Sequence, residues 1–474
     1  MINLETLNNI VLTIQNYMSN IVLIIALAAA GIWFSIRTGF IQVRGFKRGI
    51  KQVFGGLFGK KGDAGDDGMS SFQALATAIA AQVGTGNIAG AATAIALGGP
   101  GAIFWMWVAA FLGMATIYSE ALMAQRYKKI GDDGVVTGGP VYYIRAAFKG
   151  VFGKILAGIF AVLLIFALGF MGNAVQSNSI AASFHTAFGI PQWVMGLIVA
   201  VLAVFIFSGG MKRIAKVTET MVPLMAALYI VGSLIVIFCN WRNIPLAFYE
   251  IFVGAFAPAS IAGGAVGATI KLAITKGVAR GLFSNEAGMG STPHAHAVAK
   301  VAHPVEQGHA AMIGVFIDTF VVVTMTALVV ISVLYVGGPL SVDATGMVDG
   351  IDKTNMAQLA FGTFFGSTFG NSFVAICLLM FAFSTILSWN LFAKLNVEYL
   401  FARFGKMPVK IFSVIALIFI FLGSLLSNDL VWELADMFNQ LMVIPNAIAL
   451  FALSGVVAAV VKQHHHGEKV ELDE

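Results

Sequence analysis

The feature that most constrains this chain is a series of apolar segments, each long enough to cross a lipid bilayer. A helix that spans the hydrocarbon core needs about 20 mostly apolar residues. When each boundary is allowed to move by a few residues, eleven segments meet this condition, and they cover residues 14–36, 72–97, 102–125, 155–184, 193–207, 217–238, 245–275, 307–336, 361–393, 409–426 and 431–461. Because unpaired backbone groups are costly in lipid, we expect these segments to be helical. The sequence therefore predicts an all-α polytopic membrane protein with eleven transmembrane helices.

Composition supports this interpretation and excludes several classes of protein. Of the 474 residues, 58% are hydrophobic and 11% are charged, whereas about 25% of a typical soluble domain is charged. The two cysteines, Cys239 and Cys377, both lie in apolar segments and offer neither a disulfide framework nor a CxxC metal site. The sequence contains no GxxxxGK[ST] phosphate-binding motif and no HExxH motif. We therefore expect neither an ATP-driven pump nor an enzyme.

The Lys and Arg residues predict the orientation of the chain. If the N-terminus lies outside, all of the 28 Lys and Arg residues except Arg242 and Lys353 fall on the cytoplasmic side. Cytoplasmic loops of membrane proteins carry an excess of these residues. We expect a multi-pass protein of the plasma membrane with a cytoplasmic C-terminus, and the net charge of +5 then requires no nucleic-acid partner. Residues 39–71 and 276–304 are the expected long cytoplasmic stretches, and part of the first is predicted to form an interfacial helix on the bilayer surface.

The second apolar segment contains the sequence AQVGTGNIAG at residues 81–90. Gly84 and Gly86 flank Thr85, and each glycine costs a helix interior about 1 kcal/mol relative to alanine. We therefore expect the helix to be interrupted here, in the middle of the membrane. The amides that begin the next helical half favour an anionic group, and the carbonyls that end the first half favour a cation. Alternatively, the glycines only allow neighbouring helices to pack closely.

The ten segments after the first divide into two groups of five with opposite orientations. Each group begins with a glycine-containing segment, and in the second group Pro258, Gly263 and Gly264 predict an interruption. Two interrupted helices at corresponding positions of inverted halves indicate a transporter binding site. The expected organisation is an extra helix with a basic loop at 1–71, a first five-helix repeat at 72–240, a second inverted repeat at 241–461 and a cytoplasmic tail at 462–474.

Four motifs resemble those of the alanine or glycine:cation symporters. They are GTGNIAG at 84–90, GGPGAIFWMW at 98–107, GNAVQSNSIA at 172–181 and GLFSNEAGMGS at 281–291. The resemblance implies a sodium-coupled symporter of small neutral amino acids such as alanine, glycine or serine. It also implies a LeuT-type fold of five plus five inverted helices, preceded by one extra helix. The chain departs from the commoner family pattern at His294, where an apolar residue is usual; we expect this position on the cytoplasmic side, away from the site.

The candidate substrate site follows from the two charges of a small zwitterion, each of which must be paired in a low-dielectric interior. Backbone amides at the first interruption are suited to the carboxylate, and carbonyls near Phe256, Ala257 and Ala259 are suited to the ammonium. Asn173 and Gln176 are about one helical turn apart, and they either bind substrate or hold helices together. The predicted substrate-binding residues are Gly84, Thr85, Gly86, Asn173, Gln176, Phe256 and Trp389, the last as a wall of the cavity.

Oxygen-bearing residues predict where the coupling ion binds. Ser384 and Thr385 lie in the otherwise apolar ninth segment. By resemblance to the second sodium site of the fold, they are expected to bind Na⁺ together with the carbonyls of Ala80 and Val83. Alternatively, both hydroxyls bond only to carbonyls of their own helix. The carbonyl of Gln82 and the side chain of Asn87 match the other sodium position of the fold.

Asp318 is predicted to be the most deeply placed ionisable residue. Acids within the membrane are costly and usually functional, so Asp318 is interpreted either as a proton-coupling or ion-attracting group or as a structural hydrogen-bond partner. Glu120 is expected to reach the cytoplasmic interface, where its charge costs little.

A proton-coupled carrier, an amino-acid exchanger and a passive channel remain alternative functions. The channel remains because glycine-broken helices also line pores. The sequence does not indicate an oligomeric state.

Overall fold

The computed structural model describes residues 12–14, 17–58, 69–130, 136–256, 266–336, 338, 355–426 and 428–465. These residues are almost entirely helical, and the only sheet among them pairs two short antiparallel strands, β1 (Lys129–Ile130) and β2 (Val136–Thr137). Within the same ranges, six helices are long and apolar enough to cross a membrane: Gly101–Arg126, Gly150–Phe188, Gly210–Cys239, Pro304–Tyr335, Ser367–Phe404 and Val431–Ala452. The predicted class, a helical membrane protein, is therefore confirmed.

The helices of the first half follow the predicted segments closely. The chain begins with a π-helical turn η1 (Met18–Val22), α2 (Leu23–Arg37), α3 (Ile41–Arg44) and α4 (Phe46–Phe58). It continues with α5 (Ser71–Gln82), η2 (Gly86–Gly90), α6 (Ala91–Gly98), α7 (Gly101–Arg126) and α8 (Pro140–Ala147). Then come α9 (Gly150–Leu164), the π-helical turns η3 (Ile165–Gly172), α10 (Asn173–Phe188), α11 (Gln192–Phe207) and α12 (Gly210–Cys239).

The second half contains more short elements. It begins with α13 (Ile244–Phe256), α15 (Val266–Asn285), α16 (Pro293–Ala297) and α17 (Pro304–Val315), which continues through η4 (Phe316–Val323), α18 (Thr324–Val330) and η5 (Ile331–Tyr335). The remaining elements are α19 (Met356–Phe365), α20 (Ser367–Phe401), a 3₁₀ turn η7 (Ala402–Phe404), α21 (Met407–Gly423), α22 (Asn428–Ala452) and α23 (Ser454–His465).

The seventh predicted segment, residues 245–275, falls on two described helices, and the interruption expected between them lies outside the described residues. Its first part is α13, and α15 extends to Asn285, ten residues beyond the predicted end. Lys271, Lys276 and Arg280 therefore lie on a helix, although the sequence assigned them to the cytoplasmic side. Arg280 is buried and forms a salt bridge of 3.0 Å with Asp436 of α22. Arg280 is therefore held by an acidic partner inside the protein rather than exposed at a cytoplasmic surface.

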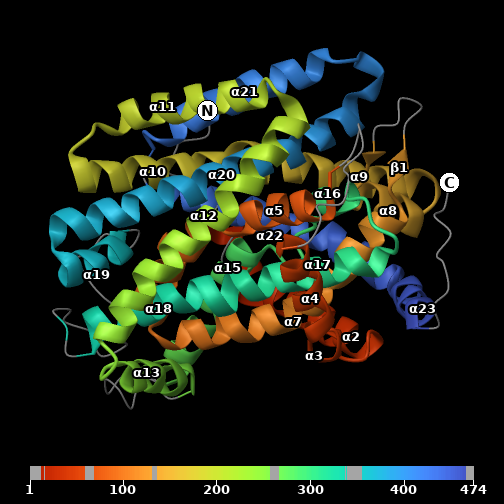
Figure 1. The fold of residues 1–474 in the computed structure, drawn as a ribbon. Helices are drawn as coiled ribbons and strands as arrows, with labels where there is room; N and C mark the ends of the chain where they lie inside the picture. Colours follow the sequence, from red (N-terminus) through yellow and green to blue (C-terminus); the bar gives the residue numbers. More distant parts are fainter. Residues whose placement is uncertain are drawn as a thin grey trace.

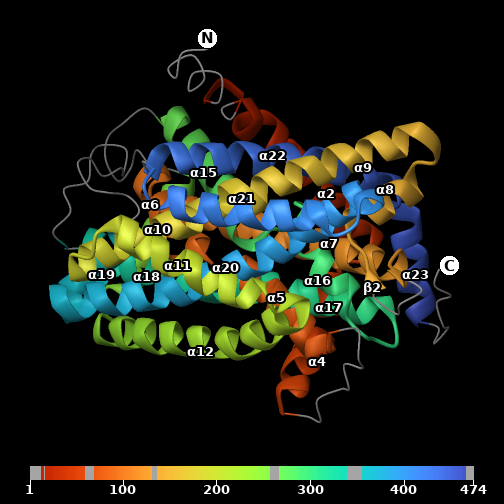
Figure 2. The same ribbon diagram turned by 90° about the horizontal axis from the view of Figure 1, so that it is seen from above.

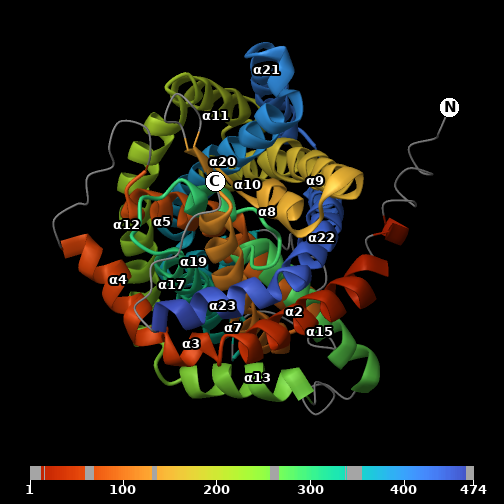
Figure 3. The same cartoon turned by 90° about the vertical axis from the view of Figure 1, so that its right-hand side faces the viewer.

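Most of the long helices lie along one common direction. Figure 1 shows α10, α11, α20 and α21 on one side and α7, α17 and α18 on the other, with α5, α15 and α22 between them. In the perpendicular view of Figure 2, α12 runs along one edge, and α9 and α22 lie toward the opposite edge. The end-on view of Figure 3 places α21 at the periphery and shows α23 crossing the end of the bundle.

The first interrupted segment lies in the interior of this bundle. Residues 74–96 are all buried, and α5 packs against α12, α17 and α20, while η2 packs against α15 and η4. The segment is rich in alanine and glycine, and small residues allow helices to approach closely in membranes. This composition explains how a helix with two ends in the middle of the bundle can be enclosed by protein on all sides.

Candidate functional site

The interruption predicted in the second apolar segment is present. Helix α5 ends at Gln82, Val83 leaves the helical region with φ −85° and ψ 82°, and η2 begins at Gly86. The amide of Gly84 donates to Asn87 Oδ1 at 3.0 Å, and the amide of Thr85 donates to Gln176 Oε1 at 3.1 Å. Side chains therefore satisfy two of the backbone groups that the interruption frees from the helix.

Close approach explains why glycine occupies both positions of the interruption, because neither Gly84 nor Gly86 has a positive φ. A Cβ atom on Gly84 would lie 2.4 Å from Thr385 Oγ1 and 3.2 Å from Gln176 Oε1. A Cβ atom on Gly86 would lie 2.9 Å from Ser284 Cα, in the backbone of α15. Gly86 thus seats a neighbouring helix, as the packing alternative predicts, whereas Gly84 faces two polar residues of the predicted site.

Three buried side chains near Gly84 carry polar atoms that have no hydrogen-bond partner within the described part of the chain. They are Thr85 Oγ1, Gln176 Nε2 and Asn173 Oδ1. Asn173 also donates through Nδ2 to the carbonyl of Gly169 at 3.0 Å, so only its acceptor is unsatisfied. Buried polar atoms are normally hydrogen-bonded. The unsatisfied donor and the hydroxyl are suited to the carboxylate of a zwitterion, and the unsatisfied acceptor is suited to its ammonium group.

Thr385 and Ser384 differ in their surroundings. The hydroxyl of Thr385 donates to the carbonyl of Ala80 at 2.8 Å and lies 3.1 Å from the carbonyl of Phe381. The hydroxyl of Ser384 instead bonds to Phe381 at 2.9 Å and lies 3.5 Å from the sulfur of Met225. Two oxygens of the predicted sodium set, those of Thr385 and Ala80, therefore converge, and Ser384 does not join them.

Asp318 forms a buried hydrogen-bonded cluster beside the interruption. Its carboxylate accepts from Ser284 at 2.9 and 3.1 Å, from Thr319 at 2.7 Å and from the side-chain amide of Asn87. These partners come from three elements, α15, η4 and η2. Gln82 lies nearby, because its amide donates to the carbonyl of Asn285 at 2.9 Å. The cluster thus links the residues predicted for the second sodium position to Asp318.

A second interruption lies where the sequence analysis expected a cytoplasmic segment. Helix α15 ends at Asn285 and α16 begins at Pro293, and between them Glu286, Gly288 and Gly290 have φ values of 58°, 93° and 76°. All residues from 284 to 299 are buried. The sequence signal was available, since GMG at 288–290 repeats the Gly-x-Gly spacing of GTG at 84–86. The expected break at Pro258, Gly263 and Gly264 lies outside the described residues.

The second interruption meets the predicted substrate site at Trp389. The indole of Trp389 donates to the carboxylate of Glu286, which also accepts from the hydroxyl of Ser291. The rings of Trp389 and Phe283 pack edge to face with their centroids 5.8 Å apart, and a Cβ atom on Gly172 would lie 2.5 Å from the Trp389 ring. Trp389 therefore joins the second interruption to the helix that carries Asn173. Glu286, which is fully buried, is a residue that sequence reasoning missed.

Glu120 does not reach water, so the expectation that its carboxylate extends to the interface is wrong. The side chain is fully buried on α7 and accepts from the amide of Gly288 at 3.2 Å and from the side chain of Asn446. Asn446 also donates to the carbonyl of Gly288 at 2.9 Å. These bonds hold the second interruption against α7 and α22. An acid that pairs with backbone in this way has no need to reach water.

Two further expectations need correction. Phe256 is 55% exposed and packs on Phe104 and Trp105, so the structure does not bring it to the other predicted site residues; Ala257 and Ala259 lie outside the described residues. His294 is not remote from the site. Its Nδ1 lies 2.7 Å from the carbonyl of Ser291, and its Nε2 lies 2.8 Å from the side-chain amide of Asn396 on α20.

A glycine-interrupted helix enclosed by protein, with unsatisfied polar atoms beside it, is the geometry of a transporter site. The sequence agrees, because the model of the sodium:alanine symporter family matches residues 4–474. The chain belongs to this family. It is therefore a transporter of the amino-acid symporter type rather than an enzyme.

Individual relatives and one solved structure extend this assignment. The chain is 39% identical to the sodium/alanine symporter AgcS of Methanococcus maripaludis, over 98% of each protein. It is also 39% identical to a probable sodium/glutamine symporter, GlnT of Bacillus subtilis, over 95% of this chain and 89% of that protein. The crystal structure of MhsT in complex with L-phenylalanine has a TM-score of 0.58 to this chain at 14% identity, and the match covers 84% of this chain and 98% of MhsT. At that identity the likeness shows a shared LeuT-like fold.

Proposed function

We propose that the protein is a sodium-coupled symporter that imports small neutral amino acids, with alanine as the principal substrate, by alternating access. The single observation that carries the proposal is the convergence of Gly84, Gln176 and Thr385 at the first interruption. A hydrogen-bonding group for the substrate and a ligand for the ion then both lie beside one glycine. Membership of the sodium:alanine symporter family supports the same function.

In this proposal, the substrate carboxylate replaces Gln176 Oε1 as the acceptor of the hydrogen bond from the amide of Thr85. The oxygen of Gln176 is a neutral acceptor on that amide, and an anionic oxygen is a stronger one. Once displaced, Gln176 uses its unsatisfied Nε2 to donate to the substrate. Asn173 Oδ1 is then the acceptor available for the ammonium, and Trp389 with Phe283 limits the side chain to a methyl or hydroxymethyl group.

Na⁺ is bound in this proposal by the hydroxyl of Thr385 and the carbonyls of Ala80 and Val83. The contact of 2.8 Å between Thr385 Oγ1 and the carbonyl oxygen of Ala80 supports this set. When the hydroxyl proton rotates away from the carbonyl, both oxygens have lone pairs free to bind a cation. Ser384 joins the set after a change of rotamer. The ion compensates the substrate carboxylate nearby, and this attraction couples the two binding events.

A second cation position is proposed at Asp318. Its carboxylate, the hydroxyls of Ser284 and Thr319 and the side chain of Asn87 meet between η2, α15 and η4. Gln82, whose side chain donates to Asn285 of α15, is proposed to add its carbonyl oxygen. Asn87 Oδ1 accepts from the amide of Gly84, while its Nδ2 donates to Asp318, so the side chain must rotate in this proposal to present its oxygen to the cation. A negative carboxylate favours a cation at this position.

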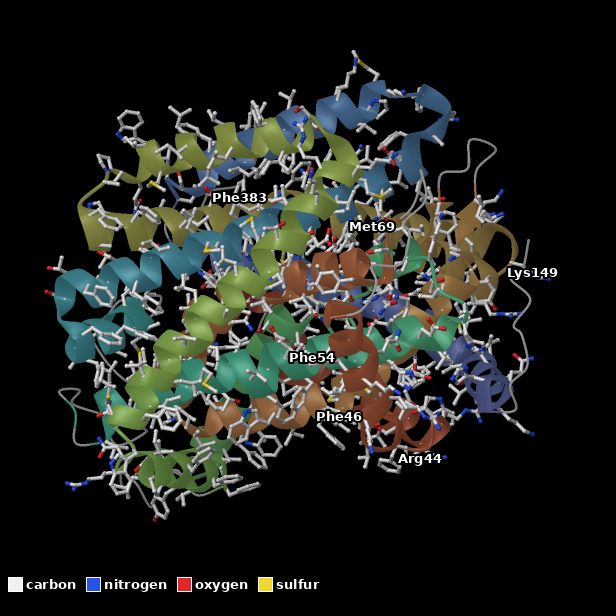
Figure 4. All side chains as sticks on the ribbon, in the orientation of Figure 1. Arg44, Phe46, Phe54, Met69, Lys149 and Phe383 are labelled. Carbon is white, nitrogen blue, oxygen red and sulfur yellow. The ribbon has the colours of Figure 1, made fainter. Side chains whose placement is uncertain are left out.

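The membrane arrangement that we propose has eleven spans, with α13 outside the count and α15 as the seventh span. The first repeat then covers residues 72–240 and the second residues 241–461, each with one interrupted helix. The N-terminus lies outside and the C-terminus in the cytoplasm. The positively charged residues support this orientation, and Arg44 and Lys149 lie toward the same end of the molecule as α8, α16 and α23 (Figure 4).

The direct test is counterflow of labelled alanine in liposomes that contain the purified protein. A sodium symporter accumulates label inside liposomes preloaded with unlabelled alanine, and the accumulation is saturable and lost when choline replaces Na⁺. Flux that is not saturable and shows no counterflow indicates a channel and overturns the proposal.

Proton coupling is the second candidate, and the buried carboxylates of Glu120, Glu286 and Asp318 favour it. A buried acid without a cation partner is a group that can take up a proton during transport. In the same liposomes, transport that follows a pH gradient and is indifferent to replacing Na⁺ by choline supports this alternative.

A further inference from the structure

An apolar groove opens on the outer surface of the bundle, away from the candidate substrate site. Its volume is about 540 Å³, and every side chain that lines it is apolar. The walls come from four elements: Ile165 and Phe170 of η3, Phe401 at the end of α20, Phe404 of η7, and Met407 and Phe412 of α21. A concavity of this size is within the range of small-molecule sites, roughly 300–1,000 Å³. The groove is therefore large enough to hold part of a hydrocarbon chain.

Three cationic residues surround one end of the groove. Arg403, Lys406 and Lys410 lie on the connection from α20 to α21 and on the first turn of α21, and all three are exposed. The guanidinium of Arg403 lies 4.7 Å above the ring of Phe404, which itself lines the groove. None of the three has an ion-pair partner among the described residues. The groove therefore combines an apolar channel with a cluster of uncompensated positive charge.

The acid nearest in the sequence does not neutralise this cluster. Glu398 lies 3.7 Å from Lys394 in an i,i+4 pair, and it lines a different cavity together with His294 and Tyr399. Helix α21 stands at the periphery of the bundle (Figure 3). Its connection to α20 lies at the end of the molecule that also carries α8 and α16 (Figure 1). This is the end where the chain concentrates Lys and Arg.

We propose that the groove binds an anionic phospholipid, with one acyl chain between α20, η3 and α21 and the phosphate at Arg403, Lys406 and Lys410. The apolar lining of the groove favours an acyl chain. The three cations favour a negatively charged headgroup, because Lys and Arg next to the membrane attract anionic lipids. A zwitterionic phospholipid satisfies only the first of these conditions, since its own ammonium cancels the attraction.

The groove lies one layer outside the helix that carries the candidate substrate site. Phe412, a wall of the groove, would contact a Cβ atom on Gly169 at 2.8 Å. The carbonyl of Gly169 accepts from Asn173 at 3.0 Å. The bound lipid therefore supports the packing of α21 on η3 without entering the site. Its presence can be measured without any transport assay, so this proposal and the proposed function stand or fall separately.

The test is native mass spectrometry of the purified full chain after incubation with equal amounts of phosphatidylglycerol and phosphatidylcholine. We expect retained phosphatidylglycerol to exceed phosphatidylcholine by at least about tenfold. In the triple variant Arg403→Gln, Lys406→Gln, Lys410→Gln this preference is lost. The control, Lys149→Gln with Lys154→Gln, removes two exposed charges before and within α9 that do not line the groove, and it keeps the preference.

A second variant tests the acyl-chain part of the site. Ile411 lines the groove and is 51% exposed, whereas Ile418 lies two turns further along α21, is 48% exposed and does not line it. Ile411→Trp fills the groove and should reduce retained phosphatidylglycerol, and Ile418→Trp should not. Equal retention of both lipids by the unmodified protein overturns the proposal. An unchanged preference in the triple variant, or equal effects of the two tryptophans, does so as well.

Discussion

The hydroxyl of Thr385 illustrates how one residue can serve both packing and ion binding. It donates to the carbonyl of Ala80 in the neighbouring helix α5 and lies 3.1 Å from the carbonyl of Phe381 in its own helix, α20. The bond within the helix is the ordinary behaviour of threonine in membranes. The contact with Ala80 is not, because that carbonyl belongs to the last turn before the interruption.

Thr385→Ala removes this oxygen and leaves α20 intact. We expect the Na⁺ concentration for half-maximal alanine uptake to rise by at least about tenfold, which corresponds to about 1.4 kcal/mol of ion binding. Thr385→Ser keeps the hydroxyl and is the matched control. Uptake measured over a range of Na⁺ concentrations tests this, and an unchanged sodium requirement in Thr385→Ala removes the proposed ion site.

Trp389 is expected to set the size of the substrate. In the unmodified protein, glycine, alanine and serine should compete with labelled alanine, and leucine should not. Trp389→Phe shortens the wall between Phe283 and Gly172, so leucine or glutamine should then compete. Trp107→Phe removes a different indole, which donates to Thr324 at 2.9 Å, and controls for the loss of a hydrogen bond. Effective leucine competition in the unmodified protein contradicts the small-site prediction.

At the scale of elements, the two interruptions differ in their origin. Close packing requires the glycines of the first, whereas the second requires left-handed backbone at Gly288 and Gly290. The sequence predicted the first because both glycines lie inside one apolar segment. It missed the second because polar residues such as Glu286 resemble a loop when read alone. Only tertiary partners such as Trp389 and Ser291 explain how that carboxylate is buried.

The apolar segments predicted most helices well, since length and hydrophobicity are local properties of the chain. The end of α15 was not predicted, because Lys276 and Arg280 are polar in sequence, whereas the salt bridge to Asp436 and the ring of Trp432 accommodate the buried Arg280. The candidate site shows the same difference between properties that are local in the sequence and contacts that depend on tertiary partners. Gly84, Gln176 and Thr385 were found from their types and positions, but Phe256 was misplaced because its partners, Phe104 and Trp105, belong to a distant segment.

Gly290 provides a test of the second interruption. A side chain at this position must adopt a positive φ, which costs about 1–2 kcal/mol, and its Cβ would lie 2.9 Å from Pro140 Cγ. Gly290→Ala should therefore lower the thermal unfolding midpoint. Gly281→Ala, inside α15, has its nearest contact at 3.6 Å and should be neutral or stabilising by up to about 1 kcal/mol. Equal midpoints for the two variants would contradict this reading of the backbone.

At the scale of the whole molecule, exposed Lys and Arg residues provide a test of the proposed orientation in the membrane. Arg242 is exposed after α12, and Lys149 is exposed before α9. The proposed orientation puts Arg242 outside and Lys149 in the cytoplasm. Buried Arg280 shows that not every positive charge reports on orientation, so exposed residues give the cleaner test.

Cysteine labelling measures this orientation directly. In a Cys239→Ser background, Arg242→Cys should react with a membrane-impermeant maleimide in intact cells, and Lys149→Cys should react only after the cells are opened. The positive-inside bias is the physical reason for this expectation. The reverse pattern would invert the proposed topology while leaving the site unchanged.

The central claim is that the first interruption forms the shared site of substrate and ion, and Gly84 tests it most directly. A Cβ on Gly84 would lie 2.4 Å from Thr385 Oγ1, whereas a Cβ on Gly90 of the same segment meets nothing closer than 3.7 Å. The measurement is the alanine affinity of purified Gly84→Ala and Gly90→Ala, with and without Na⁺, on samples whose melting temperatures are also recorded. We predict that Gly84→Ala loses at least about tenfold in sodium-dependent affinity while Gly90→Ala binds normally. A folded Gly84→Ala protein with the normal affinity and the normal sodium dependence would contradict the account.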